Sequence, residues 1–288
     1  MNCHDGDAFL EEALNSVIAQ TWTNWELIFW DNQSKDDSAL IVKKYTDPRI
    51  KYFRSSKHTM LCEARNHAID RAFGEFLAFL DVDDWWLPQK LEKQIVLFSD
   101  PEVALVYGNY WIRSEQKNRS WIAHKTRLPE GRILEALLED YKIGLPTLML
   151  RRACLPSSEL LFDPRYHVIG DFDLVVRIAA DRKIACLQAP VAVYRVHTHN
   201  GSKLFKNLYL AELESWYREK KGDQGLSLLP SFRKFGAHLE YLRSINYLFE
   251  GHRRKALCSL GKMGVRGPWL RLIVLLSLPK VLLRRLKS

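Results

Sequence analysis

Three aspartates within four residues, Asp81, Asp83 and Asp84, are the side chains of this 288-residue sequence best suited to chemistry. They follow the apolar run 76–80, which has the pattern of a strand buried on both faces. Side chains alternate along an extended segment, so Asp81 and Asp83 point to the same side and repel each other unless a cation or a proton intervenes. Mg2+ and Mn2+ take one or two carboxylates and complete their shells with phosphate oxygens and water, so the pattern predicts a metal site for a phosphate-bearing ligand. A solvated, Asp-rich turn is the alternative.

Asp31 repeats this arrangement. It ends the strand-like stretch 25–30, and the turn-forming residues 32–38 follow it. If both strands lie in one parallel sheet, Asp31 and Asp81 reach the same edge, where open α/β sheets bind ligands. A carboxylate-lined cleft that is capped by helix starts suits a nucleotide diphosphate with a metal. Taken alone, Asp31 fits a turn or a helix cap equally well.

Three further positions extend this candidate site. Arg65 stands near the start of a predicted helix, where it offers a charged fork to a base or a phosphate; a surface ion pair is the alternative. Asp171 and Asp173 begin another predicted helix, where an acid serves either as a general base or as a helix cap. His197 and His199 follow a predicted strand and belong either to a metal site or to a polar loop.

Strands alternate with helices before residue 203, which indicates an α/β unit with a largely parallel sheet. The predicted strands are 25–30, 49–53, 76–80, 103–107, 147–150 and 191–196. The predicted helices are 7–20, a short one that ends at 45, 63–73, 87–98, 132–141 and 171–182. Residues 111–129 lack a clear period and are predicted to form a loop or a pair of strands. The remainder is helical, so we expect an α/β domain at 1–203 and a helical extension at 204–288.

The composition separates a neutral body from a cationic end. Of the 43 Lys and Arg residues, ten lie at 252–288, which contains no acid, so the rest of the chain balances 33 basic residues against 34 acidic ones. A nucleic-acid-binding enzyme more often carries its basic patch around the active cleft, so no nucleic-acid partner is expected. The five cysteines are scattered and form no C-x-x-C pair, which fits reduced thiols in a cytosolic protein.

Taken in order, the motifs between residues 2 and 202 resemble the inverting glycosyltransferases of family 2, which have the GT-A fold. The matching stretches are 11–21, 24–28, 31–36, 64–66, 74–84, 170–174 and 194–197. Among them, 31–36 reads D-N-Q-S-K-D and is similar to the family's D-[DN]-x-S-x-D. The resemblance implies a nucleotide-diphospho-sugar transferase fold, with a mixed, mainly parallel sheet flanked by helices.

The resemblance also implies roles for the donor side of the site. Asp31 is expected to bind uracil or another base, and Arg65 is expected to lie near the nucleotide. Asp81 is expected to reach the ribose. Asp83 is expected to hold the Mg2+ or Mn2+ that bridges the diphosphate, and His197 is expected to touch the diphosphate or the metal.

On the acceptor side, Asp171 matches the catalytic base of the family's E-D motif, although Gly170 stands where the family usually has Glu. The implied mechanism is a single displacement, in which Asp171 deprotonates an acceptor hydroxyl that attacks the anomeric carbon. A second departure lies at the N-terminus. The family begins with an apolar strand that ends near the position of Asn2, so the first strand is expected to be missing upstream of this sequence.

The end of the chain predicts a membrane contact. The apolar stretch 269–283 is interrupted by Arg271 and Lys280, and its longest unbroken run is too short to span a bilayer. A basic, apolar helix of this kind suits the interface of an anionic membrane surface; a helix packed on the body, or a dimer contact, is the alternative. We therefore expect a cytoplasmic protein that is peripheral at the inner face of the plasma membrane.

The leading hypothesis is an inverting glycosyltransferase that moves a sugar from a nucleotide-diphospho-sugar, most simply a UDP-sugar, to a hydroxyl of a glycan or lipid-linked acceptor. Its expected setting is the synthesis of cell-surface polysaccharide or lipid-linked glycan. A nucleotidyltransferase is one alternative, but residues 1–6 offer no Gly-rich, basic phosphate loop. A non-catalytic membrane-surface or interaction protein derived from this scaffold is the other.

Overall fold

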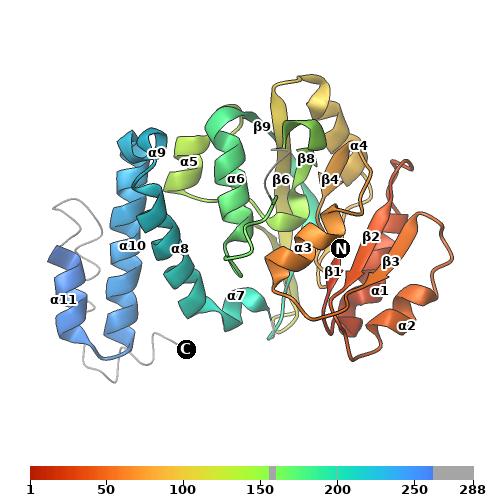
Figure 1. Ribbon diagram of the computed structural model, residues 1–288, viewed down its shortest axis with the longest axis horizontal. Coiled ribbons are helices and arrows are strands. Elements are labelled where there is room, and N and C mark those ends of the chain that lie inside the picture. Colours follow the sequence, from red (N-terminus) through yellow and green to blue (C-terminus); the bar gives the residue numbers. More distant parts are fainter. Residues whose placement is uncertain (156–159, 199, 262–288) are drawn as a thin grey trace. The chain divides into compact units, whose positions relative to one another are not determined.

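The computed structural model describes residues 1–155, 160–198 and 200–261. The chain divides into two compact units, one at Met1–Leu204 and one that begins at Phe205 (Figure 1). In the described residues, all strands belong to the first unit, which is therefore α/β, and the second unit contains helices alone.

A parallel three-stranded sheet begins the first unit. Its strands are β1 (Asn2–Cys3), β2 (Leu27–Asp31) and β3 (Ile50–Arg54), with β2 in the middle. All five residues of β2 are buried, as expected for a strand that is covered on both faces. The connecting helices are α1 (Asp7–Ile18), α2 (Ser38–Lys43) and α3 (Leu61–Ile69). These six elements confirm the alternation of strand and helix predicted for this part of the chain.

A larger mixed sheet follows, with the order β4-β8-β6-β9-β5 and with β7 paired to the side of β6. Its strands are β4 (Phe76–Ala78), β5 (Trp85–Trp86), β6 (Val103–Ser114), β7 (Arg119–Ile122), β8 (Met149–Arg151) and β9 (Lys183–Val196). In this sheet β6 and β9 run parallel and lie side by side in Figure 1, whereas the other pairs are antiparallel. Antiparallel pairs account for four of the five pairings between strands of this sheet, so the sheet is mixed with less parallel pairing than expected.

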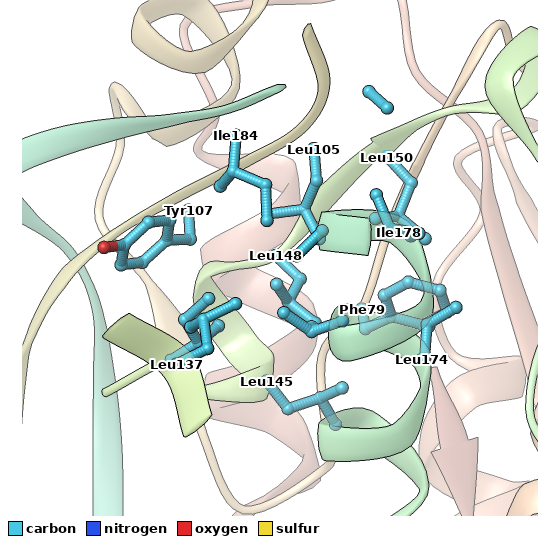
Figure 2. Close-up of a cluster of buried hydrophobic side chains, with 14 of the residues drawn as sticks. Phe79, Leu105, Tyr107, Leu137, Leu145, Leu148, Leu150, Leu174, Ile178 and Ile184 are labelled. Carbon is cyan, nitrogen blue, oxygen red and sulfur yellow. The ribbon is translucent and has the colours of Figure 1, made fainter. Parts of the chain in front are cut away.

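Helices cover this sheet and enclose the main core. They are α4 (Lys90–Ile95), η1 (Val96–Ser99), α5 (Leu134–Glu139), η2 (Leu145–Thr147), η3 (Arg152–Cys154) and α6 (Gly170–Asp181), and the short α7 (Gly201–Leu204) follows β9. Figure 2 shows Leu174 and Ile178 of α6 among side chains from β6, β8 and β9, including Leu105, Leu150 and Ile184. The helix predicted at 171–182 is therefore confirmed as α6, whose apolar face is buried, and this packing fixes the start of that helix.

A cavity of about 420 Å³ lies beside the short strand β1. Leu27 and Ile28 of β2 line it together with Phe76 and Leu77 from the first part of β4. Because Asn2 pairs with Trp30, the cavity-lining residues of β2 lie beyond the beginning of β1. The strand β1 thus extends over Asn2 and Cys3, and the cavity runs along the adjoining part of β2.

The second unit is built from α8 (Lys206–Lys220), α9 (Gln224–Leu228), α10 (Pro230–Phe249) and α11 (Arg253–Gly261). Trp216 is fully buried and packs against Phe232 and Phe235 of α10. The described helices include none that is both long enough and apolar enough to cross a bilayer. The predicted basic tail, which begins at Trp269, lies outside the described residues.

Candidate functional site

The strand β1 brings the two acid-bearing segments together. Cys3 pairs with Asp31 at the end of β2, and Asn2 forms a parallel bridge with Asp81, which follows β4. The condition set for Asp31 and Asp81, strands in one parallel sheet, is not met, because β2 and β4 belong to separate sheets. The pairing of β1 with both segments nevertheless brings the two acids to one edge, at the end of β1. This edge is where an open α/β sheet offers a binding site.

Asp31 is completely buried at this edge. Its Oδ1 accepts a hydrogen bond from the backbone N–H of Ser34 at 2.7 Å, and its Oδ2 accepts one from the Tyr52 hydroxyl at 2.6 Å. Burial and the Asp31 charge raise the pKa of Tyr52 to about 12, so this hydroxyl remains a donor at neutral pH. Asp31 thus fixes the turn after β2, and its contact with a base stays a prediction.

Arg65 and Asp81 form an ion pair with two contacts. The Nη2 atom of Arg65 lies 3.0 and 3.1 Å from the two carboxylate oxygens of Asp81. The Arg65 side chain is 8% exposed whereas Asp81 is 35% exposed, so the acid faces outward from a buried cation. The guanidinium also lies over the Phe162 ring, with its carbon 5.4 Å from the ring centroid. The pair fixes the orientation of the Asp81 carboxylate at the predicted donor site.

Asp83 lies within reach of two side chains from the segment after β9. Its Oδ2 is 3.0 Å from Nε2 of His197 and 3.3 Å from Nδ2 of Asn200. The Asn200 side-chain oxygen also accepts a hydrogen bond from the backbone N–H of His197, which fixes this turn. Burial raises the pKa of Asp83, and the nearby Asp81 charge raises it further. The predicted neighbourhood of Asp83 and His197 is thus seen, and Asn200 joins it without having been predicted.

Arg195 holds the Asp83 backbone in place. Its Nε donates to the carbonyl oxygen of Asp83 at 2.9 Å, and its backbone N–H donates to the buried Asp84 carboxylate at 2.9 Å. The guanidinium is almost fully buried and also bonds Glu12 of α1 and Glu115 after β6. Asp84 therefore serves to tie the acidic loop to β9, which leaves Asp81 and Asp83 as the acids at the site.

The two acids at the start of α6 have different surroundings. Asp173 is buried and pairs with Arg177 one turn later at 2.8 Å, so it is a structural residue. Asp171 is only partly buried, and its Oδ2 accepts a hydrogen bond from the Tyr141 hydroxyl at 3.3 Å. Burial raises the pKa of Asp171, while the Arg65 charge opposes this shift. Of the two acids, Asp171 therefore remains the candidate base.

Gly170 has a packing reason for lacking a side chain. A Cβ atom at this position would lie 2.3 Å from the Sγ atom of Cys62 in α3. Cys62 is fully buried and Gly170 is buried as well, so neither has room to move. The departure from the family's E-D motif therefore coincides with a close contact between α3 and α6, directly before Asp171.

The acids fit a hard divalent cation. The described residues include no group of three or more His, Cys, Asp or Glu side chains that would enclose a metal ion. Asp83 does offer a carboxylate oxygen whose proton affinity is raised by burial and by Asp81, and a cation relieves such repulsion. Mg2+ and Mn2+ commonly take one or two carboxylates and fill their shells with phosphate and water oxygens. The donor set therefore suits Mg2+ or Mn2+ that arrives with a diphosphate.

Comparison with protein families shows which family this chain belongs to. Residues 1–154 match the family model described as Glycosyl transferase family 2. The chain belongs to this family. As a family 2 member, the chain is a glycosyltransferase, and the motifs in 11–84 that suggested the resemblance fall within the matched region.

Two relatives of this glycosyltransferase come from bacterial polymer synthesis. It is 34% identical over 187 residues to the Escherichia coli UDP-Glc:alpha-D-GlcNAc-diphosphoundecaprenol beta-1,3-glucosyltransferase WfgD, covering 65% of this chain and 71% of WfgD. It is 30% identical over 146 residues to the putative teichuronic acid biosynthesis glycosyltransferase TuaG of Bacillus subtilis, covering 50% of this chain and 57% of TuaG.

A solved structure identifies the fold. The mannosyltransferase PcManGT of Pyrobaculum calidifontis, in complex with GDP-Man and Mn2+, superposes with a TM-score of 0.64 at 16% identity, covering 95% of this chain and 76% of that one. The expected GT-A fold, an α/β unit with a mixed sheet, flanking helices and a helical C-terminal part, is confirmed.

Proposed function

We propose that this family 2 glycosyltransferase is an inverting, metal-dependent enzyme that transfers a sugar from a UDP-sugar to a hydroxyl acceptor. The observation that carries the proposal is the position of Arg65. It bonds both oxygens of Asp81 on the donor side, and its charge acts on Asp171, the candidate base. One buried cation thus links the acids expected to bind the donor with the acid expected to activate the acceptor.

On the donor side, Asp83 and the adjoining His197 are proposed to hold Mg2+ or Mn2+, which on binding supplies positive charge to the leaving diphosphate. Asp81, oriented by Arg65, is proposed to accept a hydrogen bond from the ribose. Asp31 is proposed to recognise the base at the same sheet edge. The structure of PcManGT with GDP-Man and Mn2+ supports a nucleotide sugar and a divalent ion at a site of this fold.

On the acceptor side, Asp171 is proposed to take the proton of the attacking hydroxyl as the new C–O bond forms at the anomeric carbon. The bond from that carbon to the diphosphate oxygen breaks on the opposite face, so the configuration inverts. The Tyr141 hydroxyl donates to one oxygen of Asp171 and so helps to orient this carboxylate toward the acceptor. A general base in this position contributes about 10^2–10^4-fold to the rate.

The relatives narrow the proposed substrates. WfgD is named for UDP-Glc and a diphosphoundecaprenol acceptor, and TuaG is named for teichuronic acid biosynthesis. We therefore propose a glycan or lipid-linked acceptor and a role in cell-surface polysaccharide synthesis. Such an acceptor lies at a membrane, which accords with the proposed peripheral position of the protein on the anionic inner face of the plasma membrane.

A panel of nucleotide sugars tests the proposal. Purified protein is incubated with each UDP-, GDP- or TDP-sugar, with Mn2+, Mg2+ or a chelator, and with lipid-linked and oligosaccharide acceptors, and nucleoside diphosphate release is measured. We expect release that needs an acceptor and a divalent ion and that is fastest with one UDP-sugar. A folded protein that binds none of these donors and releases no diphosphate would support the non-catalytic alternative.

A further inference from the structure

The hairpin formed by β6 and β7, with the loop after it, carries cations that lack a counter-charge. Lys117, Arg119 and Lys125 are exposed, and their side chains form no ion pair within the described residues. The acid of this segment, Glu115, is already bonded to Arg195. The hairpin therefore presents an uncompensated positive surface in a chain whose charge before residue 252 is nearly balanced.

Aromatic and aliphatic side chains share one face of this hairpin with a cation. In the register, Trp121 stands opposite Ile112, and Arg119 stands opposite Ser114. Directly opposed residues of paired strands lie on the same face, and so do residues two apart along a strand. Arg119, Trp121 and Ile112 therefore lie on one face, and Trp121 is 36% exposed there. We call Arg119, Trp121 and Ile112, with Lys117 at the turn, the basic–aromatic face.

This face lies close along the strand to the donor site. Ile112 pairs with Tyr194 of β9, and the chain reaches His197, which contacts Asp83, three residues later. Three extended residues span about 10 Å. A partner that binds the basic–aromatic face therefore lies near the end of the sheet that carries the proposed nucleotide-sugar site.

We propose that the basic–aromatic face docks the protein on an anionic membrane surface. Tryptophan prefers the boundary between lipid head groups and hydrocarbon, and exposed Lys and Arg are attracted to anionic lipids. The combination of a half-exposed Trp, a neighbouring Ile and unpaired cations matches that environment. The face and the predicted tail are different segments of the sequence, so substitutions in each test the two contacts separately. The docking itself does not depend on the proposed transferase activity, although it would bring a lipid-linked acceptor to the site.

Vesicle sedimentation of the full 288-residue chain tests the docking. Vesicles are made from phosphatidylcholine alone or from phosphatidylcholine mixed with phosphatidylglycerol. Each Lys or Arg near an anionic bilayer contributes about fivefold to partition, so Lys117→Glu with Arg119→Glu should lower binding to the anionic vesicles by at least about twentyfold. Trp121→Ser should lower it severalfold and should also reduce the part of the binding that survives high salt.

Matched controls come from other parts of the first unit. Lys35→Glu with Lys44→Glu makes the same change in net charge at exposed positions outside the hairpin. Trp22→Ser removes a Trp of nearly equal exposure, 37%. Both controls should bind the anionic vesicles within about twofold of the parent protein, since neither touches the proposed face. Melting curves of all variants show whether each one is folded. If Lys117→Glu with Arg119→Glu melts early, the milder pair Lys117→Gln with Arg119→Gln is used in its place.

Three results would overturn the proposal. The first is hairpin variants that sediment like the parent protein, and the second is controls that lose as much binding as the hairpin variants do. The third is a parent protein that does not bind anionic vesicles; if it instead binds a single-stranded oligonucleotide through Lys117 and Arg119, the partner is a nucleic acid. Transfer to a soluble acceptor, measured in parallel, reports on the proposed function separately from the docking.

Discussion

Adding one methyl group at Gly170 should destabilise the protein, and shortening Cys62 should offset part of that loss. The Cβ of Gly170→Ala would lie 2.3 Å from the Cys62 Sγ atom, so one of the two helices must shift. Overpacking of a closed core costs about 1–3 kcal/mol. Replacing Gly by Ala at a helical position returns about 0.4–1 kcal/mol by restricting the unfolded chain. The net loss of unfolding free energy should therefore be about 1–2 kcal/mol.

The Cys62→Ala variant supplies the second arm of a double-mutant cycle. Alone, it removes one buried sulfur atom and should cost about 1 kcal/mol. Combined with Gly170→Ala, it removes the atom that the new methyl group meets, so the double variant should be more stable than Gly170→Ala alone. Residues in contact show coupling energies of 0.5–3 kcal/mol, and we expect a favourable coupling of about 1–2 kcal/mol here.

Urea unfolding of the four proteins measures this coupling, and turnover measurements show its consequence for the site. The shift of α6 in Gly170→Ala should misplace Asp171 and lower turnover while donor binding persists, and Cys62→Ala should recover part of the turnover. If Gly170→Ala is as stable as the parent protein, or if the two losses simply add, the contact between α3 and α6 does not constrain residue 170 and the reasoning is refuted.

Three other predictions concern the titrating and metal-binding groups. Asp83→Ala should abolish Mn2+-dependent UDP binding in calorimetry with little change in melting temperature; unchanged binding would remove Asp83 from the site. Tyr141→Phe removes a hydrogen bond that favours the charged Asp171 carboxylate, so the pKa of Asp171, already raised by burial, should rise further. The acid limb of the kcat–pH profile should therefore move to higher pH while the KM for the donor stays constant; an unmoved limb would contradict the role of Asp171 as the base. Burial lowers the pKa of Lys90 from 10.5 to about 7, so the unfolded chain binds the extra proton between these values and the unfolding free energy should rise with pH across that window. Lys90→Met should abolish this rise, and it should stabilise the protein more at neutral pH than at alkaline pH. Urea unfolding at both pH values measures this; if Lys90→Met changes the unfolding free energy equally at both, the lysine titrates normally.

The sequence predicted those parts of the fold that local pattern determines. The stretch that became β2 is apolar and directly precedes Asp31, and both its type and the position of its acid were predicted. The strand β6 extends to Ser114, well past the predicted end at 107, because its second half mixes polar and apolar residues and gains its partners only from β9 and β7. Tertiary pairing of this kind leaves no local apolar period to read.

The same distinction applies to the candidate site. Asp81 and Asp83 stand out because three acids follow one buried strand. Tyr141 and Asn200 carry no such signal, since each contacts an acid that is remote in sequence, Asp171 and Asp83 respectively. Gly170 was recognised only as a departure from a motif, and its reason, the Sγ of Cys62, lies on another helix.

The most direct test of the account is the turnover of Asp171→Asn. The change keeps the shape of the side chain but removes its ability to accept a proton, and the Tyr141 hydroxyl can still donate to the amide oxygen. We predict that the variant binds UDP and Mn2+ as the parent protein does and that its kcat falls by about 10^2–10^4-fold. Turnover near that of the parent protein would contradict the assignment of Asp171 as the base.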